Sequence, residues 1–245
     1  MAGSIALLAG LFFLTTAAAA PPALPAETYK KAAEADITQL KEHLKTCDTE
    51  PTQAKRFGPT AKSLAMILAM YAEATGDAPL RDGALKVADA IAKKDYKGAG
   101  EAAKGLVAKG TGKPLASGGL EGKAKFGLEE VMSPFRGSRV GGLNIEKDMR
   151  DMMKGTTPID ASALQVLAAR TAVLGEYSVA FPNEKATINA ANKAKWEKWS
   201  RDMTDISKKL DAEAAKGKGA DSKEIIKMLK LLDAKCSDCH NEFRD

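Results

Sequence analysis

The sequence predicts an all-α protein built from antiparallel four-helix bundles, and three observations lead to this fold class. Residues that favour helices (Ala, Lys, Leu, Glu and Met) are abundant, whereas aromatic residues make up only 5% of the 245-residue chain. No long alternation of Val, Ile and Thr indicates a sheet. Apolar residues recur instead at steps of three and four, which is the spacing of one helix face. A chain of this length has room for one large domain or two smaller ones.

The charges describe an ordinary globular protein. The net charge is +5, and 28% of the residues are charged against 44% that are hydrophobic. Basic residues alternate with acidic ones, as they do on solvated helix faces. Because no Arg cluster with interleaved aromatic residues is present, we expect no nucleic-acid partner.

Residues 1–22 form an apolar N-terminal segment. An apolar run from Ile5 to Leu14 is followed by small residues that offer a cleavage site near Ala18–Ala20. The run is too short for a comfortable membrane span, although no Lys or Arg precedes it as in a typical secretory signal. We predict a signal peptide and a periplasmic or otherwise exported protein. The alternative is an uncleaved N-terminal anchor.

Residues 27–136 are predicted to form a helical bundle that lacks a cofactor motif. A helix over 27–47 carries apolar residues at helical spacing. Pro59 opens a second helix that Gly76 and Asp77 close, and further helical stretches reach about Lys109. A glycine-rich loop over 109–123, "KGTGKPLASGGLEGK", follows.

Residues 137–245 are predicted to form a second bundle in tandem with the first. A short helix over 144–154 is followed by helices over 160–180 and 184–216. The last helix begins near Ser222, where Asp221 or Ser222 supplies an N-cap and Glu224 an acidic first turn.

The two regions show traces of an internal repeat of roughly 107 residues. At nearly this offset "ILAMYAEATGD" lies over "VLGEYSVAFPN", "AKGTG" over "AKGKG", and "LEEVMSPFR" over "CSDCHNEFR". The pattern predicts a tandem duplication, whereas the alternative is compositional coincidence in one extended bundle. Under this alignment the apolar residues Leu128, Val131 and Met132 correspond to Cys236, Cys239 and His240.

The ending "KCSDCHNEFRD", residues 235–245, contains the most specific motif of the chain. On a helix, Cys236, Cys239 and His240 continue the apolar stripe of Ile225, Leu229 and Leu232. Two thiols three positions apart can add to the two vinyl groups on one porphyrin edge, and the adjacent imidazole can then reach the iron. Cys-x-x-Cys-His is the signature of that attachment.

Two other chemistries use a pair of cysteines at this spacing. A structural zinc site needs four ligands, so it would have to recruit Cys47 or His43 from the first region. A thioredoxin-like disulfide prefers a helix N-terminus beside a βαβ unit, whereas here the motif ends a helix in an all-α chain.

With "CSDCHNEFR" at the end of a four-helix unit, residues 144–244 resemble the class II c-type cytochromes, the cytochrome c′ and cytochrome c556 group. The resemblance implies a periplasmic protein with one covalently bound haem c. Cys236 and Cys239 would be the thioether anchors and His240 the proximal iron ligand. It also suggests that Arg244 lies near a haem propionate, the alternative being a solvent-exposed terminal charge. Phe243 would pack against the macrocycle.

In this family the first helix of the bundle covers the other face of the haem, with either an apolar residue or a Met ligand. Here that helix, "NIEKDMRDMMK", offers Met149, Met152 and Met153. A thioether ligand raises the haem potential and favours electron transfer. The alternative is that these methionines fill the core. The helix is shorter than the resemblance implies, so the sixth ligand stays open.

The remaining candidates stay open as well. His43 lies at the edge of an apolar helix face, and a distal-ligand role across the two regions is a minor alternative. Cys47 is an odd thiol, either buried and inert or a link in a homodimer. Trp196 and Trp199 are expected to pack within the bundle.

These observations predict an exported monohaem c-type cytochrome that transfers electrons with an unidentified redox partner protein and is not an enzyme. The first alternative is binding of a small gas, nitric oxide or carbon monoxide, at a five-coordinate haem. A structural zinc site is the further alternative.

Overall fold

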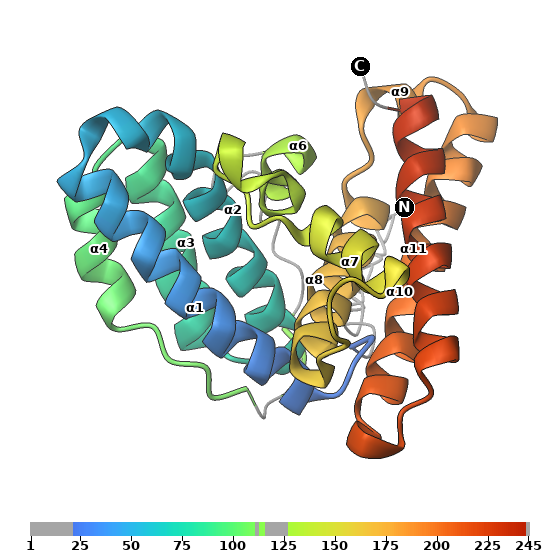
Figure 1. The fold of residues 1–245 in the computed structure, drawn as a ribbon. Helices are drawn as coiled ribbons and strands as arrows, with labels where there is room; N and C mark the ends of the chain where they lie inside the picture. The colour runs from blue at the N-terminus through green and yellow to red at the C-terminus, as the bar shows by residue number, and fades with distance from the viewer. Residues whose placement is uncertain (1–21, 111–112, 116–126, 244–245) are drawn as a thin grey trace, which may run out of the picture.

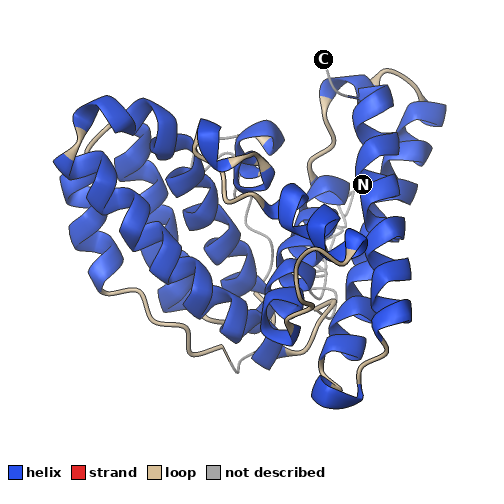
Figure 2. Cartoon of the chain, in the orientation of Figure 1, coloured by secondary structure: helices blue, strands red, loops and turns tan. Residues whose placement is uncertain are grey.

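The computed structural model describes residues 22–110, 113–115 and 127–243, and every regular element in these ranges is helical. Figure 2 shows helices joined by short loops, with no strand in this part of the chain. The predicted all-α class is therefore confirmed. The predicted signal peptide, except for Pro22, and Arg244 lie outside the described residues.

Residues 26–104 of the N-terminal half, all of them described, form four consecutive helices (Figure 1). α1 packs against α2 and α4, and α3 packs between α2 and α4. Asp77 and Asp95 cap α3 and α4 through hydrogen bonds from Leu80 N at 3.1 Å and Gly98 N at 2.8 Å. The helices are α1 (Ala26–Thr49), α2 (Pro51–Thr75), α3 (Ala78–Ala92) and α4 (Tyr96–Lys104).

Short elements connect this half to the rest of the chain. The four-residue helix α6 (Leu128–Val131) and the 3₁₀ turn η1 (Ser133–Phe135) both lie against α2. A second 3₁₀ turn, η2 (Ser138–Val140), precedes Gly141, whose φ of 86° favours glycine and where a Cβ would clash with the carbonyl oxygen of Arg56.

The C-terminal half contains three long helices and two short ones. α8 packs along α10, α10 along α11, and α11 against the short α7 (Figure 1). Asp160 caps α8 by accepting a hydrogen bond from Ala163 N at 2.6 Å. The elements are α7 (Ile145–Lys154), α8 (Ala161–Ala180), α9 (Glu184–Thr187), α10 (Ala190–Ala214), η3 (Gly217–Gly219) and α11 (Ser222–Phe243).

Two predicted helix boundaries are wrong, each for a local reason. α2 begins at Pro51, which fits the first helical turn as well as Pro59 does, and the buried helix continues through Pro59. The helix predicted over 184–216 is interrupted between α9 and α10. There Asn189 leaves helical geometry and accepts a hydrogen bond from Asn192 N at 2.8 Å, so it starts a new helix.

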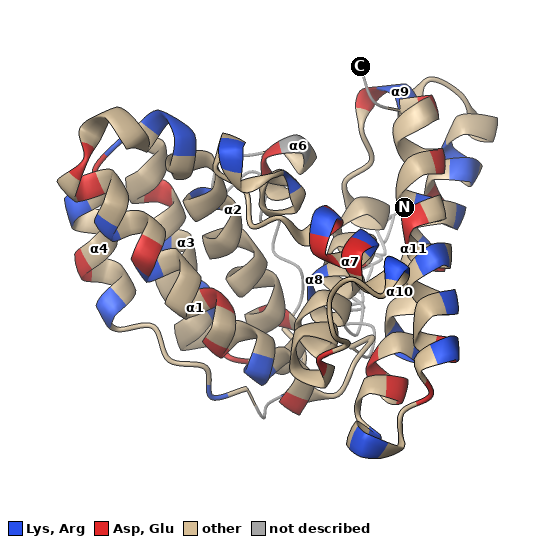
Figure 3. Ribbon diagram, in the orientation of Figure 1, with Lys and Arg blue, Asp and Glu red and all other residues tan. Residues whose placement is uncertain are grey.

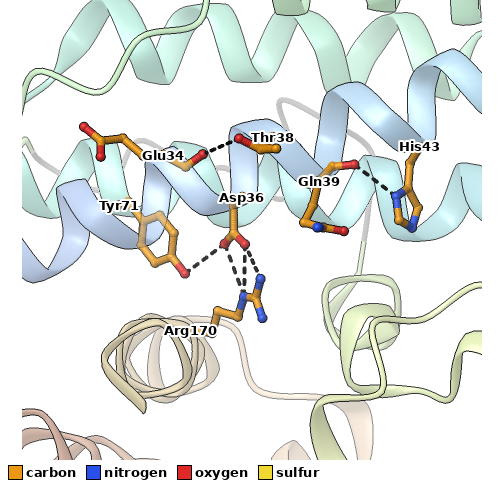
Figure 4. A network of polar contacts seen from close by, with 7 residues as sticks. All are labelled: Glu34, Asp36, Thr38, Gln39, His43, Tyr71 and Arg170. Carbon is orange, nitrogen blue, oxygen red and sulfur yellow. Dashed lines mark hydrogen bonds and ion pairs between the residues drawn. The ribbon is translucent and has the colours of Figure 1, made fainter. Parts of the chain in front are cut away.

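The two halves are joined by a continuous apolar core and by buried polar contacts. Asp36 of α1 is fully buried and accepts hydrogen bonds from Arg170 of α8, one of them from Nε at 3.1 Å (Figure 4). Tyr71 of α2 donates a hydrogen bond to the same carboxylate at 3.1 Å. The core does not divide at residue 136, and the division into domains 27–136 and 137–245 stays a prediction.

Charged residues of both signs alternate over the helices (Figure 3). Many form pairs within one helix, such as Lys93 with Asp89 at 2.6 Å and Lys198 with Asp202 at 2.7 Å. Exposed pairs at this spacing contribute only a few tenths of a kcal/mol each, roughly 0.3–0.5. In the described residues no helix combines the length and the apolar character needed to cross a membrane.

Candidate functional site

The motif residues lie in the last turns of α11, where the apolar stripe of this helix changes character. Ile225, Leu229 and Leu232 are at most 1% exposed. Cys236, Cys239 and His240 continue the stripe but are only partly buried. Phe243, one turn further on, is buried again at 4% exposure. The reactive residues therefore share one helix face, and protein atoms cover that face only in part.

Cys236 lies beside the short helix α7. Glu146 and Arg150 of α7 both act electrostatically on the thiol, as does Asp233 one turn before it. Burial is the main cause that raises the pKa of Cys236 to about 12, and Glu146 adds to it while Arg150 opposes it. Arg150 also pairs with Asp233 at 3.4 Å, and this contact ties α7 to the motif helix. The thiol is neutral at physiological pH.

Cys239 packs against a small cluster of apolar side chains that is separate from the main core. We call it the aromatic cluster, and its members are Ala186, Trp196 and Phe243. The Phe243 ring meets Trp196 edge-on with centroids 5.2 Å apart, and Trp199 in the same manner at 5.5 Å. Burial raises the pKa of Cys239 to about 11.

Hydrogen bonds fix the aromatic cluster in place. The indole of Trp196 donates to the carbonyl of Ser178 at 2.6 Å. Asn183 accepts from Ala186 N at 2.9 Å and donates from Nδ2 to the carbonyl of Phe243 at 3.0 Å. Asn183 therefore starts α9 and holds the end of α11. Its place directly before a predicted helix is an N-cap signal that could have revealed the first of these roles.

The three methionines of α7 differ in their surroundings. Met149 and Met152 are 4% and 7% exposed, and Met153 is partly buried against the main core. Successive residues of an α-helix are rotated by about 100° around its axis. We take as reference the direction midway between Glu146 and Arg150. Met153 lies about 40° from this direction, Met149 about 80° and Met152 about 140°. Arg150 pairs with Asp233 of α11 at 3.4 Å, so this side of α7 faces the motif helix. Met149 and Met153 are thus turned more toward the motif than Met152.

The structure does not bring the other candidate ligands to the motif. His43 of α1 packs edge-on against Phe57 with ring centroids 5.2 Å apart, and its Nδ1 lies 3.0 Å from the carbonyl oxygen of Gln39. Burial lowers the pKa of His43. Cys47 is 2% exposed, which agrees with a buried, inert thiol, and burial raises its pKa to about 11. Both belong to the N-terminal half.

The zinc and disulfide alternatives find no support in the described part of the chain. No group of three or more His, Cys, Asp or Glu side chains there is arranged to hold a metal ion. All three cysteines are free thiols. Among the described residues, no hydrogen bond or ion pair involves the imidazole of His240.

The donor set fits the group that the motif predicts. Covalent haem attachment needs two free thiols about one helical turn apart and an adjacent imidazole. Cys236, Cys239 and His240 meet these conditions on one partly covered face of α11.

Comparison with known proteins identifies the C-terminal half. A family model described as Cytochrome C' matches residues 143–244, which include α7 to α11. A cytochrome c' of Pararhodospirillum photometricum is 31% identical over 105 residues, which are 40% of this chain and 83% of that protein. No solved structure matches the chain significantly. The resemblance seen in the motif is thus confirmed, and the chain belongs to the cytochrome c′ family.

Proposed function

We propose that the protein is an exported monohaem c-type cytochrome that transfers electrons and is not an enzyme. The observation that carries this proposal is the set of two free thiols and an adjacent imidazole on one face of α11. This set lies in the region that the cytochrome c′ family model matches. Bound haem would supply an iron that cycles between the ferric and ferrous states.

Cys236 and Cys239 would hold the haem covalently. In each attachment the S–H bond adds across a vinyl double bond, so that sulfur bonds to one carbon and hydrogen to its neighbour. The raised pKa values of both thiols leave them uncharged near neutral pH. Since the thiol and the thioether are both uncharged, the addition places no net charge in this partly apolar site.

His240 would bind the iron on one side, and Met149 or Met153 is the candidate on the other. Both methionines lie nearer than Met152 to the side of α7 that pairs with α11, and a thioether ligand raises the potential of a haem. Met152 is turned away and, at 7% exposure, is proposed to be a core residue. Arg244 stays a candidate contact for a haem propionate.

One observation favours gas binding as the second candidate function. Met149, the more buried of the two candidate ligands, belongs to a helix of only ten residues and packs in the main core. If these contacts keep both thioethers from the iron, the sixth position stays open for carbon monoxide or nitric oxide.

Covalent attachment is tested by expressing the full chain together with a haem-attachment system. We expect the parent protein to keep its haem after acid–acetone extraction and the Cys236→Ala/Cys239→Ala variant to lose it. Cys47→Ala is the matched control and should keep the haem. A double variant that still held haem covalently would overturn the proposal. Secretion with a new N-terminus near residue 20 would support export, and retention of residues 1–20 in an inner-membrane fraction would contradict it.

The identity of the sixth iron ligand distinguishes electron transfer from gas binding. A ferric protein with a Met ligand is low-spin and shows the weak long-wavelength absorption band of a sulfur–iron bond. We expect this band to disappear in Met149→Ala or in Met153→Ala and to persist in Met152→Ala. High-spin ferric spectra of the parent, together with rapid carbon monoxide uptake by the ferrous form, would instead favour gas binding.

A further inference from the structure

A residue that precedes the family region reaches the aromatic cluster. The family model begins at residue 143, whereas Leu128 belongs to α6. Leu128 is partly buried and packs against both the main core and the aromatic cluster. Cys239 packs against the same cluster, so Leu128 and a haem-anchoring thiol flank the same few side chains.

Contacts with α2 determine where Leu128 lies. Glu130 of α6 accepts hydrogen bonds from Lys62 Nζ at 2.9 and 3.0 Å, and the Lys62 side chain is only 9% exposed. The Ser63 hydroxyl donates to the carbonyl of Glu130. Val131 and Phe135, which follow Glu130 in the chain, are buried at 0% and 7% exposure. The N-terminal half therefore fixes the helix that carries Leu128.

The Leu128 side chain has the chemical character needed to line an apolar site. An isobutyl group offers no ligand to iron and no hydrogen bond to water, so it can only fill space and exclude solvent. α7, with ten residues, is the shortest of the helices α7, α8, α10 and α11. A side chain from outside this half can therefore complete the cover of the motif.

We propose that Leu128 forms part of the wall of the haem site and limits the access of small ligands on the Cys239 side. This inference rests on the proposed function, because it requires haem at Cys236 and Cys239. It assigns to the N-terminal half a direct part in the site, although that half carries no haem motif.

Methyl NMR of the ferrous holoprotein under carbon monoxide tests the contact. This form is low-spin and diamagnetic whichever sixth ligand the parent has, so the porphyrin ring current shifts the methyl signals of touching residues. We expect Leu128→Ala to remove a pair of shifted methyl signals and Leu128→Val to replace that pair. Leu231→Ala is the control on α11, where the side chain is 45% exposed, and it should leave the shifted signals in place.

Two outcomes would count against the inference, and they can be told apart. If the parent holds covalent haem but Leu128→Ala keeps every shifted methyl signal, Leu128 does not touch the haem and the inference fails alone. If the parent holds no covalent haem, the proposed function fails and this inference with it.

Ligand access gives a second readout. After flash photolysis of the carbon monoxide complex, we expect bimolecular rebinding to be several-fold faster in Leu128→Ala and slower in Leu128→Phe than in the parent. Leu231→Ala should rebind at the parental rate. Equal rates in both Leu128 variants and the parent would overturn the role in access.

Discussion

The N-terminal and C-terminal halves are both built from helices, but they complete their interiors differently. In the N-terminal half, α2 is buried along most of its length, and small residues such as Ala65 and Ala69 let its neighbours approach closely. In the C-terminal half, the stripe of α11 is buried through Leu232 and then exposes two thiols and an imidazole in part. The difference is that the C-terminal half presents reactive side chains on a helix face that protein atoms cover only in part.

Corresponding positions of the predicted repeat show the same contrast. Val131 is fully buried where the second copy has Cys239, whereas Phe135 and Phe243 are both buried. Asp77 and Asn183, also at corresponding positions, both cap the helix that follows. These parallels support the duplication, which stays a prediction. If it is correct, Leu128, the counterpart of the proposed haem anchor Cys236, would serve the proposed haem site of the other copy.

The largest expected effect comes from breaking the buried charge pair between the halves. Asp36→Asn leaves the guanidinium of Arg170, a residue only 8% exposed, without its counter-charge and should lower the free energy of unfolding by about 3–5 kcal/mol. Both tryptophans lie in the C-terminal half, whereas circular dichroism reports on all helices. In urea denaturation of the haem-free chain, we expect both probes to shift together.

Two controls define this result. Asp89→Asn removes an exposed partner of Lys93 and should cost about 0.5 kcal/mol or less. Asp36→Leu/Arg170→Met removes both buried charges and should recover part of the loss. If the fluorescence midpoint of Asp36→Asn stayed at the parental value while the dichroism midpoint fell, the halves would be uncoupled.

The next largest effect is the difference in thiol reactivity between the halves of the haem-free chain. The pKa values of Cys236 and Cys239 are raised to about 12 and about 11, so near pH 8 fewer thiolates are present than in a free cysteine. A rise of two pKa units lowers the alkylation rate about 100-fold. The rate should therefore keep rising about tenfold per pH unit up to pH 10.

Cys47 provides the internal comparison, because its pKa is also raised to about 11 but its side chain is only 2% exposed. We expect iodoacetamide to label Cys236 and Cys239 in the native chain and Cys47 only after unfolding, as mass spectrometry of peptides can show. A rate that levelled off near pH 8.5, or labelling of native Cys47, would contradict this account.

The sequence predicted what local patterns determine. The helix predicted over 27–47 is α1 (Ala26–Thr49), and the one over 160–180 is α8 (Ala161–Ala180), because apolar periodicity and capping residues act within a few residues. The motif residues share a helix face as expected, because that face follows from their spacing alone.

Contacts between distant segments could not be predicted in the same way. Asp36 and Arg170 are 134 positions apart, and their pairing depends on how α1 meets α8. A signal existed, since Asp36 interrupts an apolar helix face and Arg170 an apolar stretch, and a charge there is costly unless it is paired. The packing of Leu128 against the aromatic cluster had no such signal. A single leucine on a short helix does not indicate which distant side chains it contacts.

The smallest expected effect concerns the packing of Ala69 of α2 and Gly175 of α8, which occupy corresponding positions of the predicted repeat. A Cβ on Gly175 would clash with Thr204 Oγ1 of α10 and come within 2.6 Å of the carbonyl oxygen of Ser200. Overpacking of this kind costs roughly 1–3 kcal/mol. The greater helix preference of alanine offsets about 1 kcal/mol of this cost.

The informative result for Gly175→Ala is therefore whether the free energy of unfolding rises or falls. Where space is available, this substitution stabilises a helix by about 1 kcal/mol, whereas the contact with α10 predicts a net loss of up to about 2 kcal/mol. The converse change, Ala69→Gly, should also destabilise, by about 1 kcal/mol, because it removes a fully buried methyl group and loosens α2. Urea denaturation of the two variants and the parent measures both values. A stabilised Gly175→Ala would mean that α8 and α10 lie further apart than described, and that the close packing of the N-terminal half has no equivalent in the C-terminal half.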